Sequence, residues 1–170
     1  MDLISDGGGL AMVHAENGLV TDYLEDRSLK RGEDQKKVFL KTRPDLLEAE
    51  AIFRALTIAS ITRCPLYIVH LSTEKGVIPI QRAKEEGQRV YVETCPQYLT
   101  MTDAKLQKLG PLAKIGPPLR SEKDRLALWK AIQKGLIDVV ASDHAPKAKK
   151  IEDPFFEAPY GSPQSETMLT

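Results

Sequence analysis

The stretch Leu66-Tyr67-Ile68-Val69-His70-Leu71-Ser72-Thr73-Glu74 joins a short apolar run to the start of a helix. The run is continuous rather than alternating, which is typical of a strand covered on both faces of a parallel sheet. Ser72 or Thr73 can cap a helix that runs to about Glu86, and Gly87 stands where a helix-ending glycine is common. This stretch therefore predicts one strand–helix unit.

Similar apolar runs occur three more times, each short and flanked by turn-forming residues. They occupy residues 10–14, 89–93 and 137–141. Two further helices are expected, one over residues 45–61 after Pro44 and one that starts at Ser121 and ends at Gly135. Because strands and helices alternate regularly, the sequence predicts an α/β fold with parallel strands and right-handed crossovers.

Two α/β architectures compete for this alternation. A doubly wound nucleotide-binding sheet requires a glycine-rich turn between its first strand and helix, whereas Gly7-Gly8-Gly9 precedes the first apolar run. A (β/α) barrel instead places reactive residues at the carboxyl ends of several strands. The sequence has the second arrangement, so we favour a barrel-type fold.

All three histidines of the chain, His14, His70 and His144, follow an apolar run, and Asp143 directly precedes the third. A lone histidine at a strand end is more often structural, but the shared position of all three favours a site. Imidazole and carboxylate groups suit Zn²⁺ or a similar divalent metal. We therefore expect His14 and His70 to be metal ligands.

Composition excludes several classes of protein. The 170 residues include 24 Lys and Arg against 24 Asp and Glu, without a basic cluster, so nucleic acid is not an expected partner. The apolar runs are too short to cross a bilayer, and the first residues carry no secretory-signal pattern. Cys64 and Cys95 form no CxxC motif, and Cys95 has no nearby base that would make it a nucleophile. We expect a cytoplasmic protein with reduced thiols that binds no membrane.

Five motifs of the chain occur in the order known from one enzyme family. They are Val13-His14-Ala15-Glu16-Asn17-Gly18, Tyr67-Ile68-Val69-His70-Leu71-Ser72, Glu93-Thr94-Cys95-Pro96-Gln97-Tyr98-Leu99, Gly116-Pro117-Pro118-Leu119-Arg120 and Ser142-Asp143-His144-Ala145-Pro146. Together they resemble the dihydropyrimidinase/hydantoinase branch of the cyclic amidohydrolases, whose relatives include dihydroorotases and allantoinases. The resemblance spans nearly the whole chain.

The resemblance implies a metal-dependent hydrolase that opens small cyclic amides. The implied fold is a partial (β/α)8 TIM barrel of the metal-dependent hydrolase type, with strands five to eight and their helices. Residues 1–170 would form one truncated barrel domain, with 147–170 as a long loop after the last strand. In the family, two divalent metals, usually zinc, share a hydroxide that attacks the ring carbonyl. Family relatives are commonly tetramers, so a homo-oligomer is expected for the full-length form.

By motif position, the resemblance also implies roles for individual residues. His14 and His70 would be ligands of one metal. Asp143 would be a ligand of the other metal and would carry the proton to the leaving ring nitrogen. Gly116 would bind the substrate amide through its backbone N–H and C=O groups. Glu16 is either a group that orients a metal ligand or a plain loop carboxylate.

Three of the family's six metal-ligand positions have no counterpart in this sequence. Neither the HxH motif of the first barrel strand nor the carboxylated lysine of the fourth precedes His14. We expect a fragment of a larger enzyme, in preference to a free-standing half-barrel that dimerises to cover its sheet edges. A half-barrel alone would expose an apolar inner face and would be poorly soluble.

The expected substrate rests on three further departures. Gly116 and Lys147 stand where dihydroorotase relatives carry Asn and His, and Gln97 stands where allantoinase relatives usually carry His. The expected substrate is therefore a dihydropyrimidine or a 5-substituted hydantoin, with a dihydroorotase or an allantoinase as alternatives. A non-catalytic scaffold that keeps the barrel is the alternative from another class. Retention of the three candidate ligands argues against that scaffold.

Overall fold

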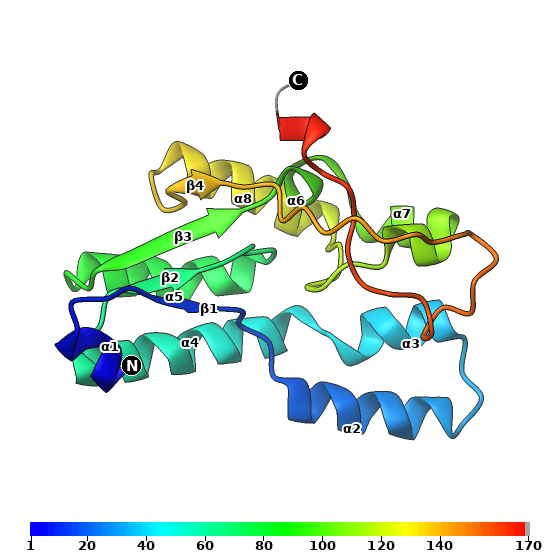
Figure 1. Cartoon of the computed structure of the whole chain (residues 1–170), viewed down its shortest axis with the longest axis horizontal. Helices are drawn as coiled ribbons and strands as arrows, with labels where there is room; N and C mark the ends of the chain where they lie inside the picture. The colour runs from blue at the N-terminus through cyan, green and yellow to red at the C-terminus, as the bar shows by residue number, and fades with distance from the viewer. Residues whose placement is uncertain (169–170) are drawn as a thin grey trace.

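The computed structural model describes residues 1–168, apart from the side chain of Thr167. At its centre lies a parallel sheet in the order β1-β2-β3-β4 (Figure 1). The strands are β1 (Ala11–Val13), β2 (Leu66–Ile68), β3 (Val90–Thr94) and β4 (Val139–Val140). Each strand falls within one of the four apolar runs, apart from the last residue of β3, so the predicted parallel α/β sheet is confirmed.

The register of the sheet brings the predicted reactive residues to one edge. Val13 pairs with Ile68 and Ile68 pairs with Val92, all in parallel strands. The carboxyl ends of the strands therefore lie together. His14 follows β1 directly and His70 follows β2 after one residue, which places both histidines at this edge.

Three helices match the predicted ones closely: α4 (Asp45–Thr62), α5 (Glu74–Glu85) and α8 (Glu122–Gln133). Thr73 caps α5 by accepting the N–H of Lys75 at 3.2 Å, and Ser121 caps α8 by accepting the N–H of Asp124 at 3.3 Å. Pro44 is the residue before the first turn of α4 rather than part of that turn. The remaining elements are α1 (Asp2–Asp6), α2 (Gly18–Leu29), α3 (Gln35–Thr42), α6 (Pro96–Thr100), α7 (Asp103–Leu109), the 3-10 helix η1 (Gly110–Ala113) and the 3-10 helix η2 (Glu166–Met168).

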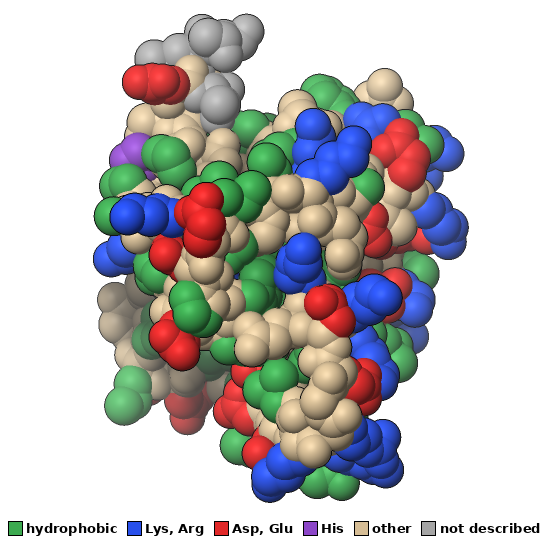
Figure 2. All heavy atoms as spheres, turned by 90° about the vertical axis from the view of Figure 1, so that its right-hand side faces the viewer, with side chains coloured by type: hydrophobic (Ala, Val, Ile, Leu, Met, Phe, Trp, Pro, Cys, Tyr) green, Lys and Arg blue, Asp and Glu red, His purple; other side chains and the backbone are tan. Residues whose placement is uncertain are grey.

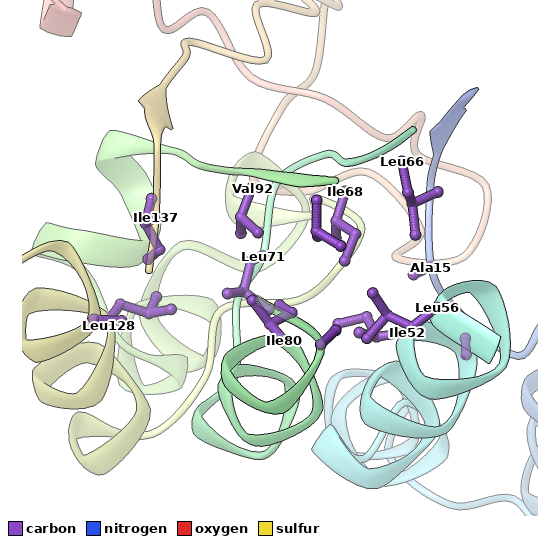
Figure 3. Packing of buried hydrophobic residues seen from close by; sticks show 14 of the residues in the cluster. Ala15, Ile52, Leu56, Leu66, Ile68, Leu71, Ile80, Val92, Leu128 and Ile137 are labelled. Carbon is purple, nitrogen blue, oxygen red and sulfur yellow. The ribbon is translucent and has the colours of Figure 1, made fainter. Parts of the chain in front are cut away.

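The main core lies between the sheet and helices α4, α5 and α8, which run along one face of the sheet (Figure 3). Leu66, Ile68 and Val92 point from the strands toward these helices. Ile52 of α4 and Ile80 of α5 meet them and are buried. Burial of large aliphatic side chains between sheet and helices is the dominant stabilising contribution in such a layer.

The opposite face of the sheet is exposed, which corrects the expectation of strands covered on both sides. Met12 is 62% exposed and Tyr91 is 46% exposed, and Val139 and Val140 are also exposed. These residues alternate along the strands with the buried ones, or lie in the short β4. The reason is that α4, α5 and α8 pack on the other face of the sheet (Figure 1).

The segment after β4 was predicted as a long loop from residue 147 to 170. Among the described residues, 147–168 form turns and irregular structure that ends in η2, and residues 169–170 of the predicted loop lie outside the described part. The segment is packed against the body of the protein. Phe155 contacts Phe39 of α3 with ring centroids 5.2 Å apart, and Lys149 Nζ donates to the carbonyl of Lys114 at 3.2 Å.

The surface agrees with the balanced composition of the chain. On the face drawn in Figure 2, lysine and arginine side chains are interspersed with aspartate and glutamate. In the part of the chain that the structure describes, no helix has the length and apolar character needed to cross a membrane.

Candidate functional site

Two of the three predicted ligands, His14 and His70, are in direct contact. Nδ1 of His14 lies 2.8 Å from Nε2 of His70, and the two rings meet edge to face with centroids 4.7 Å apart. Parallel pairing of β1 and β2 brings the two histidines together although 56 positions separate them in the sequence. The sequence prediction that strand ends bring these two side chains together therefore agrees with the geometry.

Glu16 connects to the pair through His14. Its Oε2 lies 3.1 Å from His14 Nε2, and this hydrogen bond with the carboxylate raises the pKa of His14. Glu16 therefore contacts the candidate ligand and is not a plain loop carboxylate. A carboxylate bonded to one ring nitrogen fixes which nitrogen carries the proton and which faces a ligand. Here it leaves Nδ1 of His14 to face His70.

His70 occupies a different environment. It is 7% exposed, and burial, followed by the positive charge of His14, lowers its pKa. Its Nδ1 atom is buried and has no hydrogen-bond partner among the residues that the structure describes. Its backbone φ is 40°, in the left-handed region that non-glycine residues rarely adopt. An orphaned buried polar atom and a strained backbone angle at one residue are typical of functional positions.

The distance between the two ring nitrogens is close to that of two imidazole ligands on one divalent metal. Two imidazole nitrogens bound to tetrahedral zinc, each about 2.0–2.1 Å from the ion, lie about 3.3 Å apart. The observed distance between His14 Nδ1 and His70 Nε2 is 2.8 Å, so the two nitrogens would move slightly apart to bind such an ion. Within the described residues, however, no group of three His, Cys, Asp or Glu side chains is placed to hold a metal. Two imidazoles alone are fewer than the three or four protein ligands of a typical zinc site.

Asp143 lies at the same edge of the sheet but does not join the histidine pair. It follows β4, is exposed and has a φ of 47°. The negative charge of Asp143 contributes to raising the pKa of His14. It also acts to raise the pKa of His70, but this effect is smaller than the lowering caused by burial. Asp143 is therefore within electrostatic range of both rings. His144 lies apart from the pair, and its Nδ1 accepts the backbone N–H groups of Gln164 and Ser165.

Gly116 and His14 line the same cavity of about 400 Å³, together with Glu16, Arg43 and Tyr160. A Cβ atom at position 116 would lie 3.2 Å from the ring of Tyr160. Tyr160 cannot easily move away to make space for a larger residue at position 116, because its hydroxyl accepts a hydrogen bond from Arg43 Nη2 at 2.8 Å. Glycine at 116 is therefore matched to the tyrosine beside it.

Arg43 and Tyr160 also line this cavity, and no sequence pattern predicts them as site residues. Arg43 is buried, pairs with Glu25 at 2.7 Å and lies over the ring of Phe39, 4.4 Å from its centroid. The two residues are 117 positions apart and belong to no strand. Neither periodicity nor strand-end position could have pointed to them.

Cys95 agrees with its interpretation as a structural thiol. It is fully buried, and burial raises the pKa of its thiol above its usual range. A thiol that stays protonated at neutral pH is a poor nucleophile.

Comparisons with known proteins agree with the motif resemblance. No family model matches the chain. An allantoinase of Bacillus velezensis is 40% identical over 158 residues, which are 92% of this chain and 35% of that protein. A D-hydantoinase of Streptomyces coelicolor is 39% identical over 149 residues, 86% of this chain and 32% of that protein. The crystal structure of a dihydropyrimidinase from Brevibacillus agri superposes with a TM-score of 0.87 at 36% identity, covering 92% of this chain and 36% of the other.

These similarities extend over nearly all of this chain but over only part of each relative. The chain spans about a third of the length of the proteins that it matches. Sequence and fold agree on one branch of enzymes. The chain belongs to the dihydropyrimidinase, hydantoinase and allantoinase branch of the cyclic amidohydrolases.

Proposed function

We propose that this chain forms the part of a metal-dependent cyclic amidohydrolase that contains barrel strands five to eight, with β1 to β4 in those positions. The observation that supports this most directly is the contact between His14 Nδ1 and His70 Nε2, 2.8 Å apart at the carboxyl ends of neighbouring parallel strands. Carboxyl ends of barrel strands are where active sites of this architecture form. The reaction is hydrolytic opening of a cyclic amide.

His14 and His70 would hold one divalent metal, with zinc as the expected ion, through the two nitrogens that now face each other. When bound, such a metal supplies hydroxide at neutral pH. Glu16 would accept a hydrogen bond from the Nε2–H group of His14 and so direct Nδ1 of His14 toward the metal. His70 is buried, so water reaches its ring poorly on the side that faces away from His14.

Asp143 and Gly116 would act on the substrate. The Asp143 carboxylate, exposed at the same sheet edge, would accept a proton and return it to the leaving ring nitrogen. The backbone N–H and C=O of Gly116 would bind the amide in the cavity that Gly116 shares with His14. Asp143 would also be a ligand of a second metal, whose other ligands the family places on earlier strands.

We propose a dihydropyrimidine or 5-substituted hydantoin as the substrate ring. Allantoin is the second candidate, because the allantoinase and the D-hydantoinase are 40% and 39% identical to this chain, so identity does not separate them. An assay should therefore compare dihydrouracil, a 5-substituted hydantoin and allantoin. We expect ring opening to require the HxH pair and the carboxylated lysine of the family as well.

Metal content tests the proposal before activity does. We expect His70→Ala to lower the zinc bound per chain by about tenfold or more, because it removes one of two converging ligands. The measurement is elemental analysis of purified protein, with circular dichroism to show that the fold persists. His144→Asn is the matched control, since it removes an imidazole that bonds only to the Gln164 and Ser165 backbone. Equal zinc content in His70→Ala and the unsubstituted chain would contradict the ligand assignment.

A further inference from the structure

A buried ion pair joins the loop that carries His70 to the loop that carries Gly116. Arg120 Nη2 lies 2.7 Å from Glu48 Oε2, and the exposed fractions of the two side chains are 8% and 2%. Glu48 lies in α4, and Arg120 closes the segment that begins at Gly116. The pair therefore connects three parts of the chain that are far apart in sequence.

Ser72, two residues after His70, is the point where this pair meets the histidine loop. Its backbone N–H donates to Glu48 Oε1 at 2.8 Å, and its hydroxyl donates to Glu48 Oε2. Arg120 Nε donates in turn to the Ser72 hydroxyl at 3.1 Å. Arg120 Nη1 donates to the carbonyl of Arg43, whose side chain lines the candidate cavity. Each donor of the guanidinium thus contacts a different segment.

The histidine loop needs such support because His70 has a φ of 40°. A non-glycine residue in this region carries local strain that persists only where the surroundings over-determine the backbone. Glu93 accepts the N–H of His70 at 3.3 Å from one side of the loop. Ser72, held by Glu48 and Arg120, anchors it from the other. The ring of His70 is aimed by a backbone that these groups hold.

We propose that Glu48 and Arg120 are positioning residues that hold His70 in register with Gly116, so that the candidate metal ligand and the candidate substrate-binding loop move as one unit. The inference rests on the proposed function, because it takes His70 and Gly116 as site residues. In the described residues, no hydrogen bond or ion pair joins Glu48 or Arg120 to the histidine pair, so their positioning effect runs through Ser72 and the Gly116–Arg120 segment. The charge of Glu48 also acts to raise the pKa of both histidines, and the NMR signals below report position separately from that charge.

A contribution to stability alone is a weaker explanation. A buried ion pair pays a large desolvation cost, and its replacement by uncharged groups of similar volume is often neutral for stability. Geometry favours positioning, because arginine presents its donors in a rigid fork that lysine does not reproduce. All three donor atoms of Arg120 are used here, on Glu48, Ser72 and Arg43.

The test uses the double variant E48Q/R120M in the full chain. Glutamine at 48 keeps an acceptor for the Ser72 N–H, whereas methionine at 120 removes the guanidinium contacts that join the Gly116 segment to Glu48, Ser72 and Arg43. NMR measures two signals, the cross-peaks between the His14 and His70 rings and the chemical shift of the Gly116 amide. The affinity for Co²⁺ alone and the midpoint of urea denaturation are measured as well. Ser72→Ala is the second variant, a smaller change that removes only the shared hydroxyl. Lys84→Met is the control, because it removes the 2.7 Å ion pair with Asp138 at the opposite end of the sheet.

We expect E48Q/R120M to weaken the ring cross-peaks and shift the Gly116 amide together, and to lower Co²⁺ affinity by about tenfold, the range seen when groups behind a metal ligand are removed. Ser72→Ala should do the same to a smaller extent, and Lys84→Met should change the urea midpoint only. Unchanged cross-peaks and an unchanged Gly116 shift in folded E48Q/R120M would overturn the inference. If E48Q/R120M does not fold, unchanged signals in Ser72→Ala overturn it.

Failure of the proposed function has a separate signature. In that case the unsubstituted chain does not bind Co²⁺, while the ring cross-peaks and the Gly116 shift still respond to E48Q/R120M. The NMR signals therefore test the positioning role of Glu48 and Arg120, and metal binding by the unsubstituted chain tests the proposed function.

Discussion

Gly161 is the residue whose backbone most clearly excludes any side chain. Its φ is 115°, and a Cβ atom there would lie 2.3 Å from the carbonyl oxygen of Ala145. The following residue, Ser162, pairs with His144 and accepts the N–H of Ala145 at 3.1 Å. The close approach of these two backbones holds residues 161–162 against residues 144–145.

Gly161→Ala should therefore detach this contact. Strain at φ 115° and the overlap with Ala145 together should cost about 2 kcal/mol or more. The measurement is hydrogen exchange of the Ala145 amide, which should accelerate by more than tenfold when its hydrogen bond to Ser162 is lost. Gly135→Ala is the control, because Gly135 also has a positive φ of 68° but open space around its Cβ position. The idea is wrong if both substitutions accelerate exchange at Ala145 equally.

At this scale, the sequence could predict the residues that follow strands and little else. His14 and His70 were predictable because parallel strands end at one edge. The partners that complete the site belong to other segments: Arg43 meets Tyr160 across 117 positions, and Glu48 meets Arg120 across 72. Such pairings depend on how loops cross the sheet edge, and no local pattern encodes them.

At the scale of elements, α4 and α5 pack most closely around Gly76. A Cβ atom at Gly76 would lie 2.7 Å from Leu71 Cδ1 and 2.8 Å from Ile52 Cδ1. Gly76 lies in the first turn of α5, and glycine is a poorer helix former than alanine, so its presence there reflects the space available. The two helices can approach each other only because this position has no side chain.

A double-mutant cycle between Gly76 and Ile52 should show this coupling. We expect Gly76→Ala to destabilise the chain by about 1 kcal/mol, because overpacking outweighs the gain in helix propensity. In the Ile52→Val background, which removes Cδ1, the cost should fall by about 0.5 kcal/mol or more. Urea denaturation of the four proteins gives the energies. Stabilisation by Gly76→Ala in the unsubstituted chain would show that the contact is loose.

Among the helices that the sequence did not predict, α2 has a clear physical reason for being missed. In α2, only Thr21 and Ser28 are buried, while Leu19 and Tyr23 are exposed, so the helix lacks a buried apolar stripe. Its one readable signal was the cap, since Asn17 Oδ1 accepts the N–H of Val20 at 3.3 Å. By contrast, α4, α5 and α8 bury aliphatic residues against the sheet, and their periodicity could be read.

For the whole molecule, the open sheet face is the dominant surface feature. Met12, Tyr67 and Tyr91 are in register across β1, β2 and β3, and Met12 and Tyr91 are exposed. β1 and β4 are the outer strands of the sheet, so each presents one edge without a strand neighbour among the described residues. Exposed apolar rows and open edges favour association between chains.

Charged residues on this face should reduce self-association. We expect Met12→Lys combined with Tyr91→Lys to weaken association of the chain by about tenfold or more, with little change in the urea midpoint, because both side chains are exposed. Sedimentation velocity over a concentration series measures it. Ile61→Lys is the matched control, since Ile61 is 78% exposed but lies on α4, away from the open face. Equal effects of the two changes would locate association elsewhere.

The register of β1 also has a consequence for biosynthesis. Ala11 pairs with Leu66, 55 positions further along the chain. At a translation rate of about 5–20 residues per second, β1 waits for roughly 3 to 11 s before its partner strand leaves the ribosome. During that interval β1 cannot pair with β2, and any holdase that binds the nascent chain at residues 10–13 would compete directly with the formation of this strand pair.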